Sequence, residues 1–162
     1  QGQMIQSHRI KVSYRDEVIK VVLPVLLPHR KGTYSDYIYK PLYLALKEWC
    51  RLRLEHGESL PFYEKATICF QHMYDERLPK SCIRDHDNME EKQVVDALGM
   101  FFLQSDGGLF LNTYHVSVIS NQDRTVLFLM PQNRFTTWLQ KENRESVISK
   151  KSDAASKENS TG

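Results

Sequence analysis

The stretch 88–104, with the sequence NMEEKQVVDALGMFFLQ, decides the fold. Placed at 100° per residue, its large apolar side chains fall on one arc, which is typical of a helix that packs one face against a sheet. The arc consists of Val94, Val95, Ala97, Leu98, Phe101 and Phe102. Lys92 and Asp96 fall together on a neighbouring polar edge. The pattern predicts a helix from about Asn88 to Gln104.

Both strand-forming and helix-forming segments precede this helix. His8–Val22 predicts one or two strands with a turn at Arg15–Glu17, and Ala66–Tyr74 predicts another strand. Pro41–His56 predicts a helix whose first position is the proline, where a missing N–H costs no hydrogen bond. Gly57 stands where a left-handed residue ends a helix.

The segments after the central helix predict further strands. Ser105–Gly108 contains two glycines and predicts a tight turn. Strands are expected at about Leu109–Ile119 and Arg124–Met130, joined as a hairpin by the loop Ser120–Asp123. A short closing helix is expected from Phe135 to Val147.

The order of these elements predicts an α+β fold, with two main helices on one face of a mixed sheet of about four to five strands. We expect a single domain over residues 1–148. The tail, 149–162, has no aromatic or large apolar residue, so we expect it to be disordered. The 41% hydrophobic content excludes a wholly disordered chain. The longest apolar run, Val21–Leu27, contains a proline and is far shorter than the roughly 18 residues of a membrane span.

The net charge of +2 is near neutral, so any nucleic-acid footprint must be local. The three cysteines stand far apart, which argues against a disulfide framework and for the reducing cytoplasm. Cys69 and His72 have a spacing that zinc sites use, but side chains three apart on a strand face opposite sides. We therefore expect Cys69 in the core and His72 as an ordinary polar strand residue.

Two aspartates, Asp85 and Asp87, stand two residues apart after the expected strand. In an extended segment both point to the same side, and an antiparallel return after the helix could bring Asp106 beside them. Three carboxylates suit Mg²⁺ or Mn²⁺, which can activate water and stabilise a phosphodiester under attack. The alternative is structural: Asp87 caps the helix with Glu90 completing a capping box, and Asp106 is a turn residue.

This acidic segment also resembles a known family. Asp85-His86-Asp87-Asn88, Lys92, Asp96-Ala97-Leu98 and Asp106 resemble the motif of the RusA-type Holliday-junction resolvases of bacteria and their phages. That motif has Asp-x-Asp-Asn, a lysine one helical turn later, Asp-Ala-Leu and then an acidic pair. The expected helix, strand and final hairpin stand in the family's order, so the resemblance covers roughly residues 20–130.

The resemblance implies a small dimeric nuclease that uses Mg²⁺ or Mn²⁺ to make paired nicks in a four-way DNA junction. Carried over by position, it implies that Asp85, Asp87 and Asp106 bind the metal and that Lys92 contacts the scissile phosphate. The alternative is a catalytically inactive module of the same fold, from a phage or mobile element, that binds nucleic acid or protein.

The sequence departs from the motif in two places. One extra residue separates Asp87 from Lys92, and one residue is about 100° of helix rotation. Glu91 stands at the usual spacing instead, on the apolar arc, either as an additional ligand or as a favourable acid in the first helical turn. The second departure is Ser105, which precedes Asp106 where the family commonly has a second acid.

Basic and aromatic residues outside the motif are candidates for DNA contacts. Arg84, Lys80, Arg30 and Lys31 could bind phosphates, and Arg84 could instead balance the neighbouring acids. A cluster of tyrosines either stacks on exposed bases or packs a helix onto the sheet, and packing is the commoner role. The cluster consists of Tyr34, Tyr37, Tyr39 and Tyr43.

Overall fold

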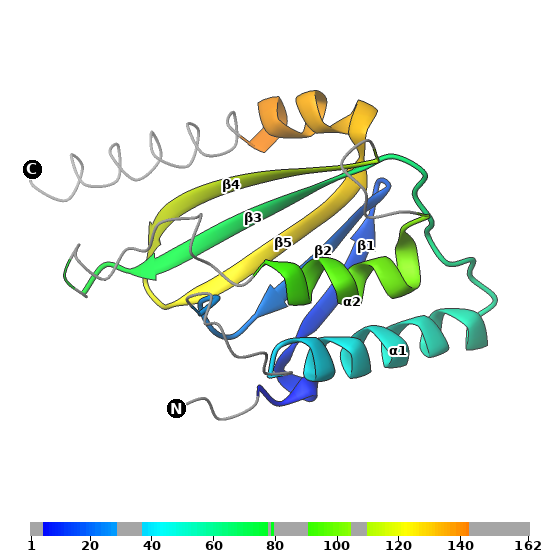
Figure 1. The fold of residues 1–162 in the computed structure, drawn as a ribbon, viewed down its shortest axis with the longest axis horizontal. Helices are drawn as coiled ribbons and strands as arrows, with labels where there is room; N and C mark the ends of the chain where they lie inside the picture. Colours follow the sequence, from blue (N-terminus) through cyan, green and yellow to red (C-terminus); the bar gives the residue numbers. More distant parts are fainter. Residues whose placement is uncertain (1–4, 29–36, 78, 80–90, 105–109, 143–162) are drawn as a thin grey trace, which may run out of the picture. The chain divides into compact units, whose positions relative to one another are not determined.

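The structure is a computed structural model that describes residues 5–28, 37–77, 79, 91–104 and 110–142. The chain divides into two compact units, Gln1–Gln132 and Asn133–Gly162. The first unit contains a five-stranded sheet and two α-helices (Figure 1). In the second, residues 135–142 are helical, which agrees with the start of the predicted closing helix.

The α+β prediction is confirmed. The elements are η1 (Ser7–Arg9), β1 (Lys11–Arg15), β2 (Val18–Leu23), α1 (Tyr39–Glu55), β3 (Ala66–Asp75), α2 (Lys92–Phe102), β4 (Leu111–Ser120), β5 (Arg124–Pro131) and η4 (Gln132–Arg134). The strand order is β1-β2-β5-β3-β4, and β3 and β4 are parallel while the other neighbours are antiparallel. No helix in the described part of the chain is long and apolar enough to cross a membrane.

The core lies between α1, α2 and one face of the sheet (Figure 1). Leu46 of α1, Leu98 of α2, Phe70 of β3 and Leu127 of β5 are all fully buried. The predicted arc of α2 supplies Val94, Ala97, Leu98 and Phe102 to this core. Cys69, on the opposite face of β3, is also buried, as predicted.

The predicted hairpin of the last two strands is wrong. β4 and β5 do not pair with each other, because β3 lies between them and pairs with both. The three residues between them pass the end of β3, where Asp123 Oδ1 accepts a hydrogen bond from the Asp75 N–H at 2.8 Å. The physical reason is burial: β3 is buried on both faces over Ala66–Phe70, and a central position pairs both of its edges.

Both main helices begin at residues other than those predicted. α1 begins two residues before Pro41, and buried Gln93 Oε1 accepts the N–H groups of Ile38 and Tyr39 at 3.0 and 2.9 Å. α2 begins at Lys92 with Glu91 at the N-cap, four residues later than expected. The capping role predicted for Asp87 is therefore not the one seen at the start of α2.

Candidate functional site at the start of α2

Glu91 lies where α2 approaches β4. It occupies the N-cap of α2, and its carboxylate reaches the strand, where Oε2 lies 3.3 Å from Nε2 of His115. Hydrogen bonds from His115 and Thr113 lower the pKa of Glu91, against the opposing effect of partial burial. The side chain is 33% exposed. Glu91 is thus an ionised carboxylate at the surface, held by two donors of β4.

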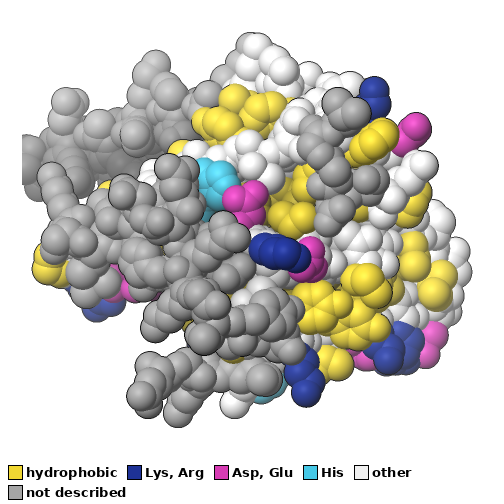
Figure 2. Space-filling model, in the orientation of Figure 1, with side chains coloured by type: hydrophobic (Ala, Val, Ile, Leu, Met, Phe, Trp, Pro, Cys, Tyr) yellow, Lys and Arg dark blue, Asp and Glu magenta, His cyan; other side chains and the backbone are white. Residues whose placement is uncertain are grey.

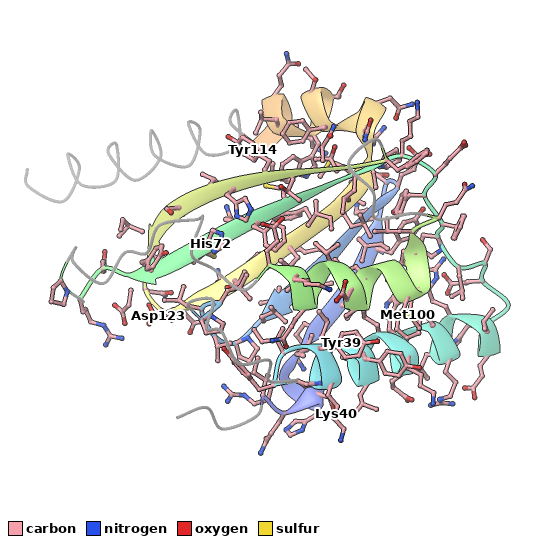
Figure 3. The ribbon with its side chains drawn as sticks, in the orientation of Figure 1. Tyr39, Lys40, His72, Met100, Tyr114 and Asp123 are labelled. Carbon is pink, nitrogen blue, oxygen red and sulfur yellow. The ribbon has the colours of Figure 1, made fainter. Side chains whose placement is uncertain are left out.

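His115 in turn contacts His72, in the middle of β3 (Figure 3). His115 Nδ1 and His72 Nε2 are 2.9 Å apart, and the two rings are nearly coplanar, with an interplanar angle of 3°. Phe70, the register partner of His115, stacks on its ring at 4.5 Å between centroids. Alternation along the strands places all three rings on the helix side of the sheet.

The carboxylate of Glu91 determines the direction of the first hydrogen bond in this chain. An ionised carboxylate only accepts, so His115 Nε2 donates to Glu91. His115 Nδ1 and His72 Nε2 share the next hydrogen bond, whose direction depends on which of the two nitrogens carries a proton. A chain of hydrogen bonds thus runs from fully buried His72 through His115 to the surface carboxylate of Glu91. His72 is therefore not the ordinary polar strand residue that we predicted.

Lys92 and Asp96 form an ion pair one helical turn apart. Lys92 Nζ lies 2.7 Å from Asp96 Oδ2, and the lysine side chain is 67% exposed. Figure 2 shows histidine, acidic and basic side chains next to one another on this face. The predicted shared edge of Lys92 and Asp96 is confirmed, and a phosphate would have to compete with Asp96 for the ammonium.

Most of the predicted site residues lie outside the described part of the chain. These are the metal ligands Asp85, Asp87 and Asp106 and the DNA-binding residues Arg84, Lys80, Arg30 and Lys31. Within the described residues, no group of three or more His, Cys, Asp or Glu side chains could hold a metal ion. The metal site therefore stays a prediction.

Asp85 and Asp87 fall within residues 80–90, and Asp106 falls within residues 105–109. The described residues next to these two ranges lie at different points along β4. Gln104 and Phe110, on either side of residues 105–109, form backbone hydrogen bonds with Tyr63, which precedes β3, and with Ala66, its first residue. Glu91, which follows residues 80–90, lies beside His115, four positions beyond Leu111. At about 3.3 Å per residue this separates the two ends by about 13 Å along the strand.

Two residues of the tyrosine cluster, Tyr39 and Tyr43, pack in a row of aromatic rings that ends on α2. Tyr39 stacks on Tyr43 at 5.9 Å between ring centroids, and Tyr43 contacts Phe101 at 5.1 Å. All three are half-buried. Packing, the commoner role, is what the structure shows for these residues; Tyr34 lies outside the described residues.

Sequence reasoning missed His115, Thr113 and the role of His72. The one available signal was the position of His72, which continues the alternating buried set Ile68 and Phe70 of β3. A histidine in such a set needs a polar partner from a neighbouring strand. The identity of that partner depended on the parallel pairing of β3 with β4, which was not predicted.

Comparison with known protein families assigns this chain to one family. A family model described as a family of unknown function, DUF6100, matches residues 1–152. The chain belongs to the DUF6100 family. No curated protein matches the chain.

Solved structures show only distant likeness to this DUF6100 member. One is the periplasmic domain of Helicobacter pylori MotB, with 13% identity and a TM-score of 0.40 over 90% of this chain and 95% of that one. Another is a putative translation initiation inhibitor from Salmonella typhimurium, with 10% identity and a TM-score of 0.30 over 75% and 87% of the two chains. Likeness at this level says nothing about function.

Proposed function

We propose that this DUF6100 protein is a Mg²⁺- or Mn²⁺-dependent, structure-selective endonuclease of the RusA type that hydrolyses phosphodiester bonds in branched DNA, such as Holliday junctions. One observation carries the proposal: an ionised carboxylate, Glu91, is held by β4 at the surface, directly beside Lys92. Both follow Asp85 and Asp87 in the sequence. DNA of this kind implies a cytoplasmic protein.

The chemistry of Glu91 fits a hard cation. Its carboxylate is ionised, partly exposed and oriented by donors, as the carboxylates of metal sites are. In the proposal Asp85, Asp87 and Asp106 hold the metal and Glu91 is an additional ligand, whereas Asp96 is committed to Lys92. When bound, the cation would activate water and stabilise the charge of the phosphodiester.

The other residues bind and orient. His115 keeps its proton on Nε2, facing Glu91, and so holds the carboxylate in position. Lys92 offers an ammonium group to a phosphate oxygen, and Asp96 holds that ammonium at the surface until DNA replaces it. Each contact of this kind with the DNA backbone weakens with added salt.

A second function is favoured by the Lys92–Asp96 pair. Lys92 pairs with Asp96 at 2.7 Å on the surface of α2. In the sequence, one extra residue separates it from Asp87 compared with the RusA-type motif. Both features suit a module of the same fold that binds branched DNA or protein without cutting.

A cleavage assay tests the proposal. The full chain is incubated with a synthetic four-way junction or a linear duplex, with and without Mg²⁺. We expect metal-dependent nicks in the junction that disappear in the Asp85→Asn, Asp87→Asn double variant. The matched control is Glu64→Gln, which removes one exposed acid elsewhere and should cut normally.

Each other outcome points elsewhere. Cleavage that persists in the double variant would rule out these aspartates as metal ligands. Junction binding without nicks would support the binding module, and absence of both would remove DNA as the substrate. In the Asp96→Asn variant we expect several-fold tighter junction binding, because the carboxylate that pairs with Lys92 no longer competes with phosphate.

A further inference from the structure

The basic side chains of α1 fall into two groups. They are Lys40, Lys47, Arg51 and Arg53. Arg51 pairs with the carboxylates of Glu48 and Glu55, the two acids of this helix. Arg53 pairs with Glu58 at 2.8 Å, and its guanidinium also donates to the backbone oxygen of Ser59. Both arginines are thus bonded to neighbours along the chain, and Arg51 balances the acids of α1.

The second group, Lys40 and Lys47, is not balanced in this way. Both lysines are exposed, and neither forms an ion pair with any of the described residues. Seven residues of helix turn through about 700°, so the two side chains leave α1 on the same side, about 10.5 Å apart along its axis. Leu44 lies between them and is 47% exposed. α1 therefore presents two positive charges in a line on its outer surface.

This line of lysines begins beside the candidate site. Gln93, in the first turn of α2, accepts a hydrogen bond from the Tyr39 N–H at the start of α1. Lys40 directly follows Tyr39 (Figure 3). Lys92 directly precedes Gln93, so the two exposed lysines flank this contact. Because α1 and α2 pack on the same face of the sheet, Lys92, Lys40 and Lys47 share one outer surface (Figure 1).

We propose that a duplex arm of the junction lies along α1, where Lys40 and Lys47 bind its phosphates; this inference rests on the proposed function. Lys92 then contacts the phosphodiester at the candidate site, and the two lysines of α1 hold the same arm farther along. Each strand of duplex DNA carries a phosphate about every 3.4 Å of its axis, so the α1 lysines span about three phosphates. A lysine binds such a phosphate as a point charge.

The charge of the whole chain makes the location of these lysines decisive. Its net charge is only +2, so attraction for DNA has to come from a local group of basic residues. Contacts to phosphates position DNA without reading its sequence, which suits an enzyme that selects a structure. We therefore expect that removing these two lysines weakens binding far more than removing two lysines elsewhere.

Fluorescence anisotropy of a labelled four-way junction, without added metal, measures binding separately from cleavage. The full chain with Lys40→Gln and Lys47→Gln should bind about tenfold more weakly at about 0.1 M salt. The slope of log affinity against log salt should become shallower by about 1.8, because each lost phosphate contact removes about 0.9. The variant with Lys40→Arg and Lys47→Arg, which keeps both charges, should bind within about twofold of the native chain.

The matched control removes the same charge from the opposite face of the sheet. Lys11 and Lys20 are exposed, and their neighbours Val12 and Val21 pack into the core on the helix side. Alternation along the strands therefore directs both lysines away from α1 and α2. The variant with Lys11→Gln and Lys20→Gln should bind the junction as the native chain does.

The outcomes separate this inference from the proposed function. Equal losses in the two glutamine variants would show an effect of net charge and would overturn the assigned surface. Native binding by the Lys40→Gln, Lys47→Gln variant would also overturn it, even if the chain nicks junctions. Binding that depends on these lysines supports the inference even if no junction is cut, whereas a native chain that binds no junction would overturn both proposals.

Discussion

The two edges of the sheet differ in length, charge and the way the chain reaches them. β1 has 5 residues, begins at Lys11 and ends at Arg15, and a two-residue turn joins it to β2. β4 has 10 residues without a charged one, and the chain reaches it through α2. β1 is protected in the usual way, by shortness and lysine or arginine. β4 is unprotected.

The candidate site explains part of this difference. The side chains of Thr113 and His115 on β4 hold Glu91. A lysine or an acidic residue at either position would therefore lose this contact. β4 thus contributes side chains to the candidate site, whereas none of the contacts described there comes from β1.

The largest expected change in stability comes from truncating Phe70 of β3, which packs against β4. Phe70 is fully buried and stacks on His115. Phe70→Ala should lower the free energy of unfolding by about 3–5 kcal/mol, because it leaves a cavity in the core. Urea denaturation measures this. Phe62→Ala, at a side chain 62% exposed, should change it by less than about 0.5 kcal/mol, and equal losses would contradict the assigned core.

Acid should weaken the contact between α2 and β4. The pKa of Glu91 in the folded chain lies below its ordinary value, chiefly through the hydrogen bond from His115. Its contribution to stability is therefore complete above about pH 4.3, the ordinary value of a glutamate, and is lost as pH falls through the lower folded pKa.

Unfolding measured from pH 6 down to pH 3 tests this effect. In Glu91→Gln the stability should fall less steeply with acid than in the native chain, and in Glu64→Gln, an exposed acid, it should fall as in the native chain. Identical slopes in all three would show that the Glu91–His115 contact does not form in solution.

The turn between β1 and β2 can be made more stable by substitution. Asp16 and Glu17 have positive φ angles of 51° and 68°, a conformation that favours glycine. Glu17→Gly should raise the free energy of unfolding by about 0.5–1 kcal/mol, seen as a higher Tm. Gly57→Ala, at φ 74° with open space around it, should have the opposite sign. A lower Tm for Glu17→Gly would contradict the turn geometry.

The smallest change in stability should come from removing the charges of β1. Lys11→Thr with Arg15→Thr should alter the free energy of unfolding by less than about 0.5 kcal/mol, because both side chains are exposed. Light scattering should nevertheless detect more association, since the edge strand β1 then carries no charge. Unchanged scattering would show that β1 is protected by its length alone.

Much of the fold could be predicted from local patterns. The turn between β1 and β2, the buried strand Ala66–Tyr74 and the apolar arc of α2 all follow from periodicity and turn residues. The pairing of β4 could not. The local sequence Ser120–Asp123 predicts a hairpin loop. The last two strands are separated because β3, which is buried on both faces, pairs with both of them.

For the candidate site, too, local features could be predicted and contacts between distant residues could not. The sequence by itself determined the α+β class, the common edge of Lys92 and Asp96, and the burial of Cys69, because each depends on residues close in the chain. Only the tertiary structure decided that His72 and His115, 43 residues apart, share a hydrogen bond, and that Glu91 completes the chain. Contacts between strands depend on sheet order and register, and these are set by the burial of the whole core, which no local pattern records.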